Sequence, residues 1–442
     1  MIKKFLFSLL AFTAFTTYAQ NWVYDSVYLG PGYRNEVYYS LKNKMVDTVP
    51  VRNWHMAFSA KGGKDAAYYT ILVNHSNDVR VAKYPNSDIT GWSAFDTAGW
   101  KSWRRFFNGD EKWSEGALNR DPESHPYYSW GVYNSNVAGE IDGDSIFVIY
   151  ATPNPPAQPW AKKFYVVARK SVSGVRSWTF RYANLDGTGD TTVTLMDNNY
   201  NKNNFMYYNL MKDQELKREP DNNKWDLLFT RYFAKQTDPS NPYYQVTGVL
   251  HNVPCKAIRI KGELSDLVSV TDTGDSRFSD KINTIGYDWK TFDFNSNKFL
   301  MGDSLTYVVL NSNVESNATV TYEIYKLKFT GFGGGANGKV AFATQKMLTL
   351  NTAINTVDEN KFVYTLSPNP SNGNTQLFVN TEKLSAMQIN IYDLNGKLIY
   401  NQQAKNNGFH VYSLPTENLG KGLYIVNIQC GNSQQTEKLV IQ

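Results

Sequence analysis

Histidines are the residues of this 442-residue sequence with the clearest chemical potential, and there are five of them: His55, His75, His125, His251 and His410. His75 and His251 each follow a run of strand-forming residues, at 68–73 and 243–250. Two imidazoles at nearly equivalent strand ends could form a bis-histidine pair, a ligand set that holds haem iron. The alternative is that each is an ordinary histidine of a surface turn. Met56 is a further candidate as a soft ligand, with a place in the core as its alternative.

Two other motifs are better explained as turns. Gly302-Asp303-Ser304-Leu305 spells a hydrolase nucleophile motif, but the only later histidine is His410, and the similar run at 143–146 marks a repeated turn before a strand. The stretch 184–190 offers oxygen ligands around a glycine, but it lacks the closing glutamate of a calcium loop. We therefore predict no catalytic residues, no metal site and no enzyme activity.

The tract 92–113 is rich in Trp, Phe and Arg, with Trp103 and Arg104 at its centre. Clustered Trp and Arg can build a recognition surface or stack against a flat ligand. They can equally cover the open end of a barrel. Both interpretations stay open.

These residues lie in a sequence that repeats itself. Tyr38-Tyr39 followed by Trp54 corresponds to Tyr207-Tyr208 followed by Trp225. The runs 143–148 and 302–308 also correspond, as do 178–182 and 325–329. Four landmarks in one order predict two repeats, residues 20–197 and 198–348, each a curved antiparallel sheet folded on itself or packed against the other.

The composition is that of an all-β protein. Aromatic residues make up 15% of the chain, with 30 Tyr and 24 Phe, and charged residues only 19%. Bulky aromatic and β-branched side chains pack well on a pleated sheet. A net charge of +5 without a basic run argues against a nucleic-acid partner.

Residues 1–19 read as a secretory signal, with Lys3 and Lys4 before an apolar run that is too short to cross a bilayer. No later segment is a transmembrane candidate. Cys255 and Cys430 lie in different predicted domains, so we expect two buried free thiols rather than a disulfide.

After a polar linker at 349–361, residues 362–442 read as an Ig-like β-sandwich of short strands. Its motifs resemble the type A C-terminal sorting domain of type IX secretion; the matching residues are Pro368, Asn369, Pro370, Asp393, Gly396, Lys397, Gly422 and Tyr424. The resemblance implies a Bacteroidota cell, the type IX translocon and sortase machinery as partners, and a secreted or outer-membrane cell-surface location. An ordinary adhesive module is the alternative.

The body resembles the HmuY family of secreted haem-binding proteins in the runs 54–58, 219–230, 246–250 and 328–332. This implies two tandem HmuY-like antiparallel β repeats, with haem or another porphyrin as the possible cofactor and haem or a haem protein as a partner. The sequence therefore predicts an exported cell-surface or secreted binding protein. The alternative is a structural or adhesive surface protein with the same fold and no haem site.

Overall fold

The computed structural model describes residues 21–60, 69–119, 126–153, 158–172, 174–238, 242–270, 272–302, 304–314, 320–352, 362–371, 373–431 and 433–442. Strands make up 55% of the structure and helical turns 7%, in several antiparallel sheets, so the all-β prediction is confirmed. The predicted signal at 1–19 lies outside the described residues. No helix in the described ranges combines the length and apolarity needed to span a bilayer.

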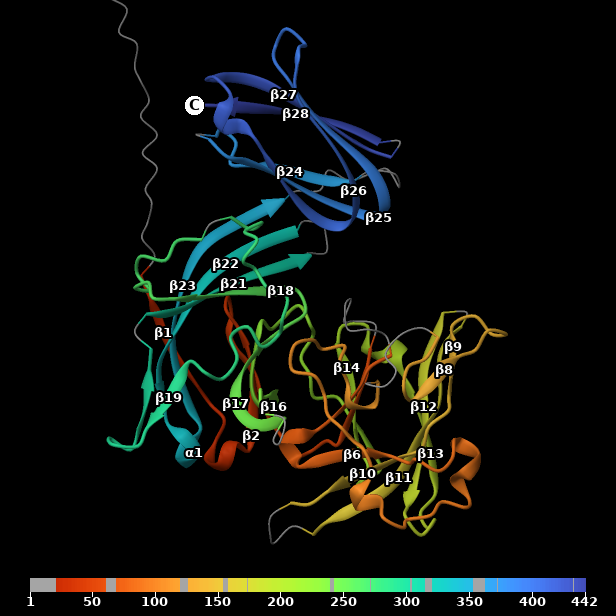
Figure 1. Ribbon diagram of the computed structural model, residues 1–442. Coiled ribbons are helices and arrows are strands. Elements are labelled where there is room, and N and C mark those ends of the chain that lie inside the picture. Colours follow the sequence, from red (N-terminus) through yellow and green to blue (C-terminus); the bar gives the residue numbers. More distant parts are fainter. Residues whose placement is uncertain are drawn as a thin grey trace, which may run out of the picture.

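One sandwich, which we call the terminal sandwich, is built from both ends of the body (Figure 1). Its two sheets have the strand orders β17-β16-β2-β3 and β1-β23-β22-β21-β18. The strands are β1 (Val23–Tyr28), β2 (Asn35–Ser40), β3 (Lys44–Pro50), β16 (Leu227–Lys235), β17 (Tyr243–His251), β18 (Cys255–Lys261), β21 (Leu305–Val314), β22 (Val320–Phe332) and β23 (Lys339–Thr352), with a side hairpin of β19 (Lys290–Asp293) and β20 (Lys298–Met301) and the short helix α1 (Gly334–Asn337).

The second sandwich, which we call the inserted sandwich, is made of residues 56–216. Its sheets have the orders β5-β4-β14-β15 and β13-β12-β11-β10-β6-β7; β9 also pairs with β11, and β8 pairs with β9. The strands are β4 (Met56–Ser59), β5 (Ile71–Val73), β6 (Val79–Lys83), β7 (Arg105–Phe106), β8 (Gly131–Tyr133), β9 (Glu140–Gly143), β10 (Phe147–Ala151), β11 (Trp160–Val172), β12 (Val175–Asn184), β13 (Thr191–Met196), β14 (Phe205–Asn209) and β15 (Gln214–Leu216).

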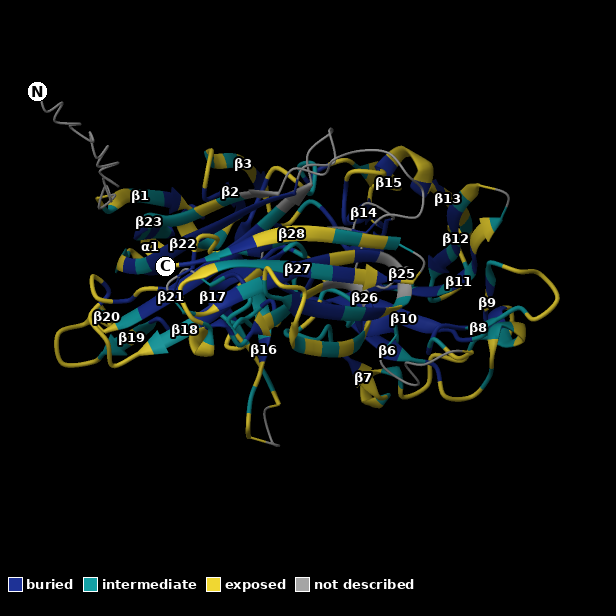
Figure 2. Ribbon diagram, turned by 90° about the horizontal axis from the view of Figure 1, so that it is seen from above, coloured by how far each residue is buried: buried dark blue, intermediate teal, exposed yellow. Residues whose placement is uncertain are grey.

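Each sandwich has its own apolar core because alternate residues of each strand point inward (Figure 2). Phe58, Phe164 and Phe180 are fully buried in the inserted sandwich, and Phe229 and Phe342 in the terminal one. The clustering of aromatic residues in the sequence is thus explained by two sheet-on-sheet cores.

The strand orders of the two sandwiches correspond, but the sandwiches do not coincide with the predicted repeats. The strand orders β17-β16-β2-β3 and β5-β4-β14-β15 match if β1–β12 and β13–β23 are the repeating units. The first three strands of each unit then complete the sandwich of the other: β2 pairs with β16, and β14 pairs with β4. The predicted boundary at 197/198 therefore falls inside the inserted sandwich, because the halves exchange their leading strands.

Three of the four sequence landmarks occupy matching strands. The fourth does not: residues 178–182 lie in β12, next to the edge strand β13, whereas residues 325–329 lie in the central strand β22. Alternating aromatic and polar residues recur in many strands of both sheets, so this similarity did not mark equivalent positions.

The C-terminal unit contains β24 (Val363–Ser367), β25 (Thr375–Tyr392), β26 (Leu398–Leu414), β27 (Gly422–Cys430) and β28 (Ser433–Ile441), in the order β24-β25-β27-β28 with β26 beside β25. Its strands enclose a separate core that includes Leu377, Ile389 and Val426. Of the predicted linker at 349–361, residues 349–352 are the end of β23, and 353–361 lie outside the described residues.

Candidate functional site

The two sandwiches meet at a symmetrical pair of aromatic contacts. Tyr38 of β2 packs edge-on against Trp225, with ring centroids 5.0 Å apart, and Tyr207 of β14 packs edge-on against Trp54, also at 5.0 Å. Between them stands Trp113, with ring centroids 6.0 Å from Phe205 and 6.5 Å from Trp225. We call the region around Tyr38, Trp54, Trp113, Tyr207 and Trp225 the joint.

Trp113 comes from an insertion that only the first repeat carries. Its indole Nε1 donates to the backbone carbonyl of His251 at 3.0 Å. The neighbouring Asp110 accepts from Asn283 Nδ2 at 3.0 Å, and Glu111 forms an ion pair with Lys281 at 2.7 Å. The loop at 110–113 thus anchors the inserted sandwich to residues 281–283 of the terminal one.

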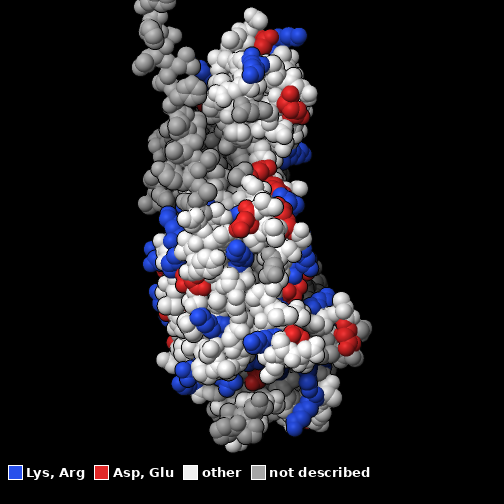
Figure 3. Space-filling model, turned by 90° about the vertical axis from the view of Figure 1, so that its left-hand side faces the viewer, with Lys and Arg blue, Asp and Glu red and all other residues white. Residues whose placement is uncertain are grey.

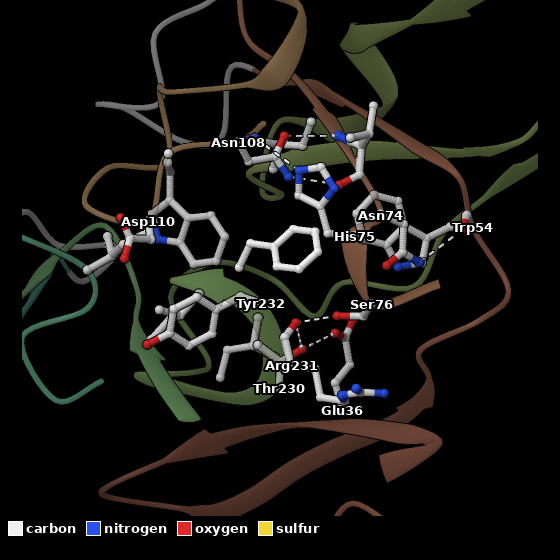
Figure 4. Close-up of a pocket in the computed structure, with 18 of the residues that line it drawn as sticks. Glu36, Trp54, Asn74, His75, Ser76, Asn108, Asp110, Thr230, Arg231 and Tyr232 are labelled. Atoms are coloured by element: carbon white, nitrogen blue, oxygen red, sulfur yellow. Dashed lines mark hydrogen bonds between the residues drawn. The ribbon is translucent and has the colours of Figure 1, made fainter. Parts of the chain in front are cut away.

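The joint contains a partly open cavity of about 90 Å³ (Figure 4). Apolar walls come from Trp54, Leu228 and Leu250, and polar atoms from Glu36 and Thr230. Thr230 Oγ1 donates to Glu36 Oε2 at 2.8 Å. Pockets for drug-sized ligands have volumes of roughly 300–1,000 Å³, so this cavity suits a few water molecules better than a cofactor.

His75 lines this cavity, but both of its ring nitrogens are occupied. Nδ1 lies 3.0 Å from the Val79 carbonyl, and Nε2 accepts from the backbone N–H of Asn108 at 3.0 Å. Burial, together with the charge of Arg80, lowers the pKa of His75 to about 3, so the ring is neutral at pH 7. A neutral imidazole with two partners has no free lone pair for a metal.

His251 is also buried, but its position differs. Nδ1 lies 2.9 Å from the Asn252 carbonyl, and Nε2 makes no hydrogen bond in the described part of the chain. Burial lowers the pKa of His251, and the carbonyls of Asn252 and Lys281 oppose that shift. The ring borders a second, open cleft of about 400 Å³. Trp113 and Tyr322 of the body also line this cleft, and Asn380 lines it from the C-terminal unit.

The predicted equivalence of the two histidines is off by two positions. The equivalent residues are Asn74 and Asn252, whose side chains donate to the carbonyls of Trp54 and Trp225 at 3.0 and 2.8 Å. His75 follows its asparagine and His251 precedes its own. The two imidazoles therefore border different cavities and do not form a bis-histidine pair.

A third histidine, His55, occupies the position in the inserted sandwich that corresponds to Asp226 in the terminal sandwich. Its Nδ1 accepts from the backbone N–H of Leu210 at 3.0 Å, just as Asp226 accepts from that of Leu41 at 2.6 Å. Both side chains fix the hairpin that the other repeat supplies. Met56 is fully buried in the core of the inserted sandwich, which is its ordinary role.

The joint also buries charge. Arg218, on the crossing from β15 to β16, forms an ion pair with Glu36 of β2, and its guanidinium donates to the Pro50 carbonyl at 2.9 Å. Glu219 accepts the backbone N–H groups of Asn204 and Phe205, each at 3.0 Å. Burial raises the pKa of Glu219 to about 8. Together these contacts tie the crossing to both sandwiches.

The remaining candidates of the Trp/Arg tract serve the fold. Trp103 packs on Tyr84 at 5.1 Å and on Phe95 at 5.9 Å, over the outer face of the sheet that contains β6 and β10. The Arg104 guanidinium lies 4.9 Å from the Phe106 ring. Of the two interpretations given for this tract, a cover over a sheet is nearer to the structure than an exposed recognition surface.

The sorting-motif residues hold the C-terminal unit together. Asn369, between Pro368 and Pro370, donates to the Lys438 carbonyl and accepts from the Val440 N–H, so it pins the opening segment to β28. Asp393 Oδ1 accepts from the N–H of Lys397 at 3.0 Å, closing the predicted turn in which Gly396 takes a positive φ of 79°. At the start of β27 after Gly422, Tyr424 donates to the Gly420 carbonyl at 2.9 Å.

Sequence reasoning missed the joint itself. The paired Tyr and Trp landmarks signalled a repeat, but nothing local in the sequence shows that Tyr38 contacts the tryptophan of the other copy. Glu36 and Arg218 lie 182 residues apart and carry no motif. Among the described residues no group of three or more His, Cys, Asp or Glu side chains could hold a metal ion. On the face shown in Figure 3, basic and acidic side chains are interspersed.

Comparisons with known proteins identify the C-terminal unit. Residues 365–442 match the family model of the secretion system C-terminal sorting domain. The predicted type IX sorting domain is therefore confirmed, and it implies engagement with the type IX machinery and a secreted or surface-attached protein. No curated protein matches the chain.

Two solved structures show limited similarity. Dimeric latent PorU from Porphyromonas gingivalis has 9% identity over 84% of this chain and 31% of its own, with a TM-score of 0.17. The trimeric ectodomain of the C. elegans fusion protein EFF-1 has 9% identity over 67% of this chain and 66% of its own, with a TM-score of 0.16. This chain spans about a third of the PorU chain. With TM-scores this low, the role of the body is inferred from its own geometry alone.

Proposed function

We propose that this protein is a non-enzymatic structural or adhesive protein that type IX secretion delivers to the cell surface. The observation that carries the proposal is the joint: each sandwich is completed by strands from the other repeat, and Trp113 fills the space between them. The body is thus a two-lobed unit whose lobes share strands, with a partly open cavity of about 90 Å³ at the joint. Shared strands and export suit a scaffold at the cell surface.

The delivery half of the proposal is tested in cells. The full chain and a variant lacking residues 365–442 are expressed in a host with type IX secretion, and protease is added outside. We expect the full chain to be cleaved from outside and the shortened chain to be protected and retained. Equal protection of the two forms would contradict surface delivery through this unit.

Haem or porphyrin binding, which the HmuY-like resemblance implies, is the second candidate. His251 is the candidate ligand, because its Nδ1 lies against the Asn252 carbonyl and its Nε2 has no hydrogen bond to a side chain of the described residues. The ring is 1% exposed, so a ligand in the adjoining cleft would reach Nε2 only after the wall of the cleft moves. The cleft that it borders, about 400 Å³, falls within the range of ligand pockets. His75 offers no free nitrogen, so a site here would use His251 alone.

A haemin titration of the full chain, followed by absorbance, decides between the candidates. The scaffold proposal expects no saturable Soret change. A haem site would give saturable binding that is lost in His251→Ala and kept in His75→Ala. The second variant is the matched control, because it removes another buried histidine of the same joint.

A further inference from the structure

The segment of residues 22–51, which we call the leading segment, packs in the terminal sandwich, but the chain runs from it directly into the inserted sandwich. Its strands β1, β2 and β3 lie in the two sheets of the terminal sandwich, where Val27, Leu29 and Tyr39 are buried in the core. The chain then passes directly into β4 of the inserted sandwich, since β3 ends at Pro50 and β4 begins at Met56. In Figure 1 these first strands lie among strands from the second half of the body.

Exchange of leading strands is already the rule within this chain. β1 pairs with β23 over six residue pairs and β2 with β16 over three, whereas the equivalent strands β13 and β14 pair with β12 and β4. Every sandwich therefore accepts its first three strands from a different repeating unit. The acceptor contacts depend on sequence and shape, not on covalent continuity with the donor.

The contact between the leading segment and its acceptor is imperfectly packed. The cavity of about 90 Å³ lies directly against Glu36 and Tyr38 of β2. Beside it, the buried Nε1 atoms of Trp54 and Trp225 and the Nε of Arg218 have no hydrogen-bond partner among the described residues. At this point the leading segment therefore borders a cavity and is not enclosed by close-packed side chains.

A buried polar contact made by Arg218 holds β2 in place. Arg218 bonds to Glu36 and to the Pro50 carbonyl, so one side chain of the second crossing holds two points of the leading segment. A buried ion pair contributes little net stability relative to well-packed apolar residues, and in some proteins it specifies register and pairing. Such a contact fixes where the segment binds, whichever chain supplies it.

We propose that the leading segment is exchangeable between molecules, and that its partner is a second copy of this chain: residues 22–51 of one copy fill the gap beside β16 and β23 of the next. The short crossing at 51–55 favours this, because short hinges promote domain swapping. Reciprocal exchange closes a dimer, and one-way exchange builds a linear array of copies. The inference goes beyond the proposed function and does not depend on whether the body binds a ligand.

A disulfide trap in the full chain tests the proposal. Ser26 of β1 and Ala341 of β23 are directly opposite and half-buried on the face away from the core. In the variant Ser26→Cys/Ala341→Cys, a disulfide forms within one chain if the leading segment packs on its own chain. It forms between chains if the leading segment packs on another copy. Two differently tagged preparations are mixed at several concentrations in mild urea, returned to buffer and oxidised, and then resolved on non-reducing gels.

We expect mixed-tag, disulfide-linked species whose share rises with concentration and which disappear under reducing conditions. The matched control is Thr179→Cys/Thr194→Cys, a directly opposed pair on β12 and β13 of the inserted sandwich, where both strands are part of one continuous stretch. It should link only within a chain. The buried Cys255 and Cys430 are present in both variants. Exclusively intrachain links in the Ser26/Ala341 variant, or equal interchain linking in the control, would overturn the proposal.

Discussion

Tyr38 packs edge-on against Trp225 at 5.0 Å, although the two residues belong to different repeats. The same contact recurs between Tyr207 and Trp54 at the same distance. In both cases a tyrosine on a leading hairpin meets the tryptophan that precedes the acceptor strand. The two tyrosine–tryptophan contacts thus occupy corresponding places in the two sandwiches, and Trp113 is the residue that breaks the symmetry.

Replacing Trp113 with Ala is expected to uncouple the two sandwiches. The side chain packs on the apolar clusters of both, around Tyr207 on one side and Trp225 on the other. Its loss should lower the free energy of unfolding by about 3 kcal/mol. Calorimetry should then show two transitions in place of one for the body.

The control for this variant is Trp103→Ala, which removes a tryptophan from the outer face of the inserted sandwich alone. It should lower the stability of that sandwich and leave the coupling intact. A single sharpened transition in Trp113→Ala, indistinguishable in shape from the control, would show that Trp113 does not connect the two cores.

The Glu36–Arg218 pair should behave as a buried ion pair in a double-mutant cycle. Glu36→Gln or Arg218→Met alone leaves a buried charge without its partner, and each should cost about 3–5 kcal/mol. The double variant should cost less than the sum of the two, by about 1–3 kcal/mol. Urea unfolding of the four proteins gives these values.

An exposed pair provides the comparison. Arg277 pairs with Asp275 at 2.6 Å, with 56% of the arginine side chain exposed, and Arg277→Met should change stability by less than about 1 kcal/mol. Strict additivity at Glu36 and Arg218 would mean that the two charges are not coupled.

How far the sequence predicts this structure depends on the range of the interactions. The all-β class and the turn at Asp393–Lys397 follow from local composition and spacing, and the structure contains both features. The predicted bounds of the two repeats do not match the two sandwiches. The exchange of β1–β3 does not follow from local composition and spacing, because the apolar pattern of each leading strand suits either acceptor sheet. In the structure the exchanged strands are held by contacts between residues far apart in the sequence, such as Glu36 with Arg218 and Tyr38 with Trp225.

The candidate site shows the same limit at the level of single residues. His75 and His251 follow similar runs in the sequence, yet pairing of Met56 with Val73 and of Leu227 with His251 shows that they differ by two positions. A shift of this size is invisible without the register of the strands. Whether a histidine keeps a free nitrogen depends on backbone groups such as the Asn108 N–H, which no side-chain pattern specifies.

Buried histidines make the protein sensitive to acid. Burial, aided by the charge of Arg80, lowers the pKa of His75 to about 3, and burial lowers that of His55 to about 4. The unfolded chain takes up these protons near pH 6.5, whereas the folded protein resists them. The stabilising contribution is complete above pH 6.5 and is lost by about 1.4 kcal/mol per pH unit for each group, down to about pH 4 for His55 and about pH 3 for His75.

The variant His75→Gln should therefore be less stable than the parent at pH 7 but lose less stability on going to pH 5. The free energy of unfolding in urea at a series of pH values gives both slopes. His410→Gln, at an exposed position of β26, is the control and should keep the parental slope. If the slopes of parent and His75→Gln coincide between pH 6.5 and 5, His75 binds its proton equally in the folded and unfolded chains, which contradicts a lowered pKa in the folded protein.

Asn369 should determine the local stability of the sorting unit without affecting the body. Its side chain accepts from the Val440 N–H at 3.0 Å and donates to the Lys438 carbonyl at 2.6 Å, which joins the opening segment to β28. Asn369→Ala removes both bonds and should cost about 1–2 kcal/mol. Hydrogen exchange followed by mass spectrometry should show faster exchange in peptides 363–371 and 433–441, with body peptides unchanged. Asn395→Ala, in the turn between β25 and β26, is the matched control and should leave those peptides protected.

If surface delivery requires the folded form of this unit, Asn369→Ala should also lower the fraction of chain cleaved by external protease. Unchanged exchange with reduced delivery would instead mean that Asn369 contacts the secretion machinery directly.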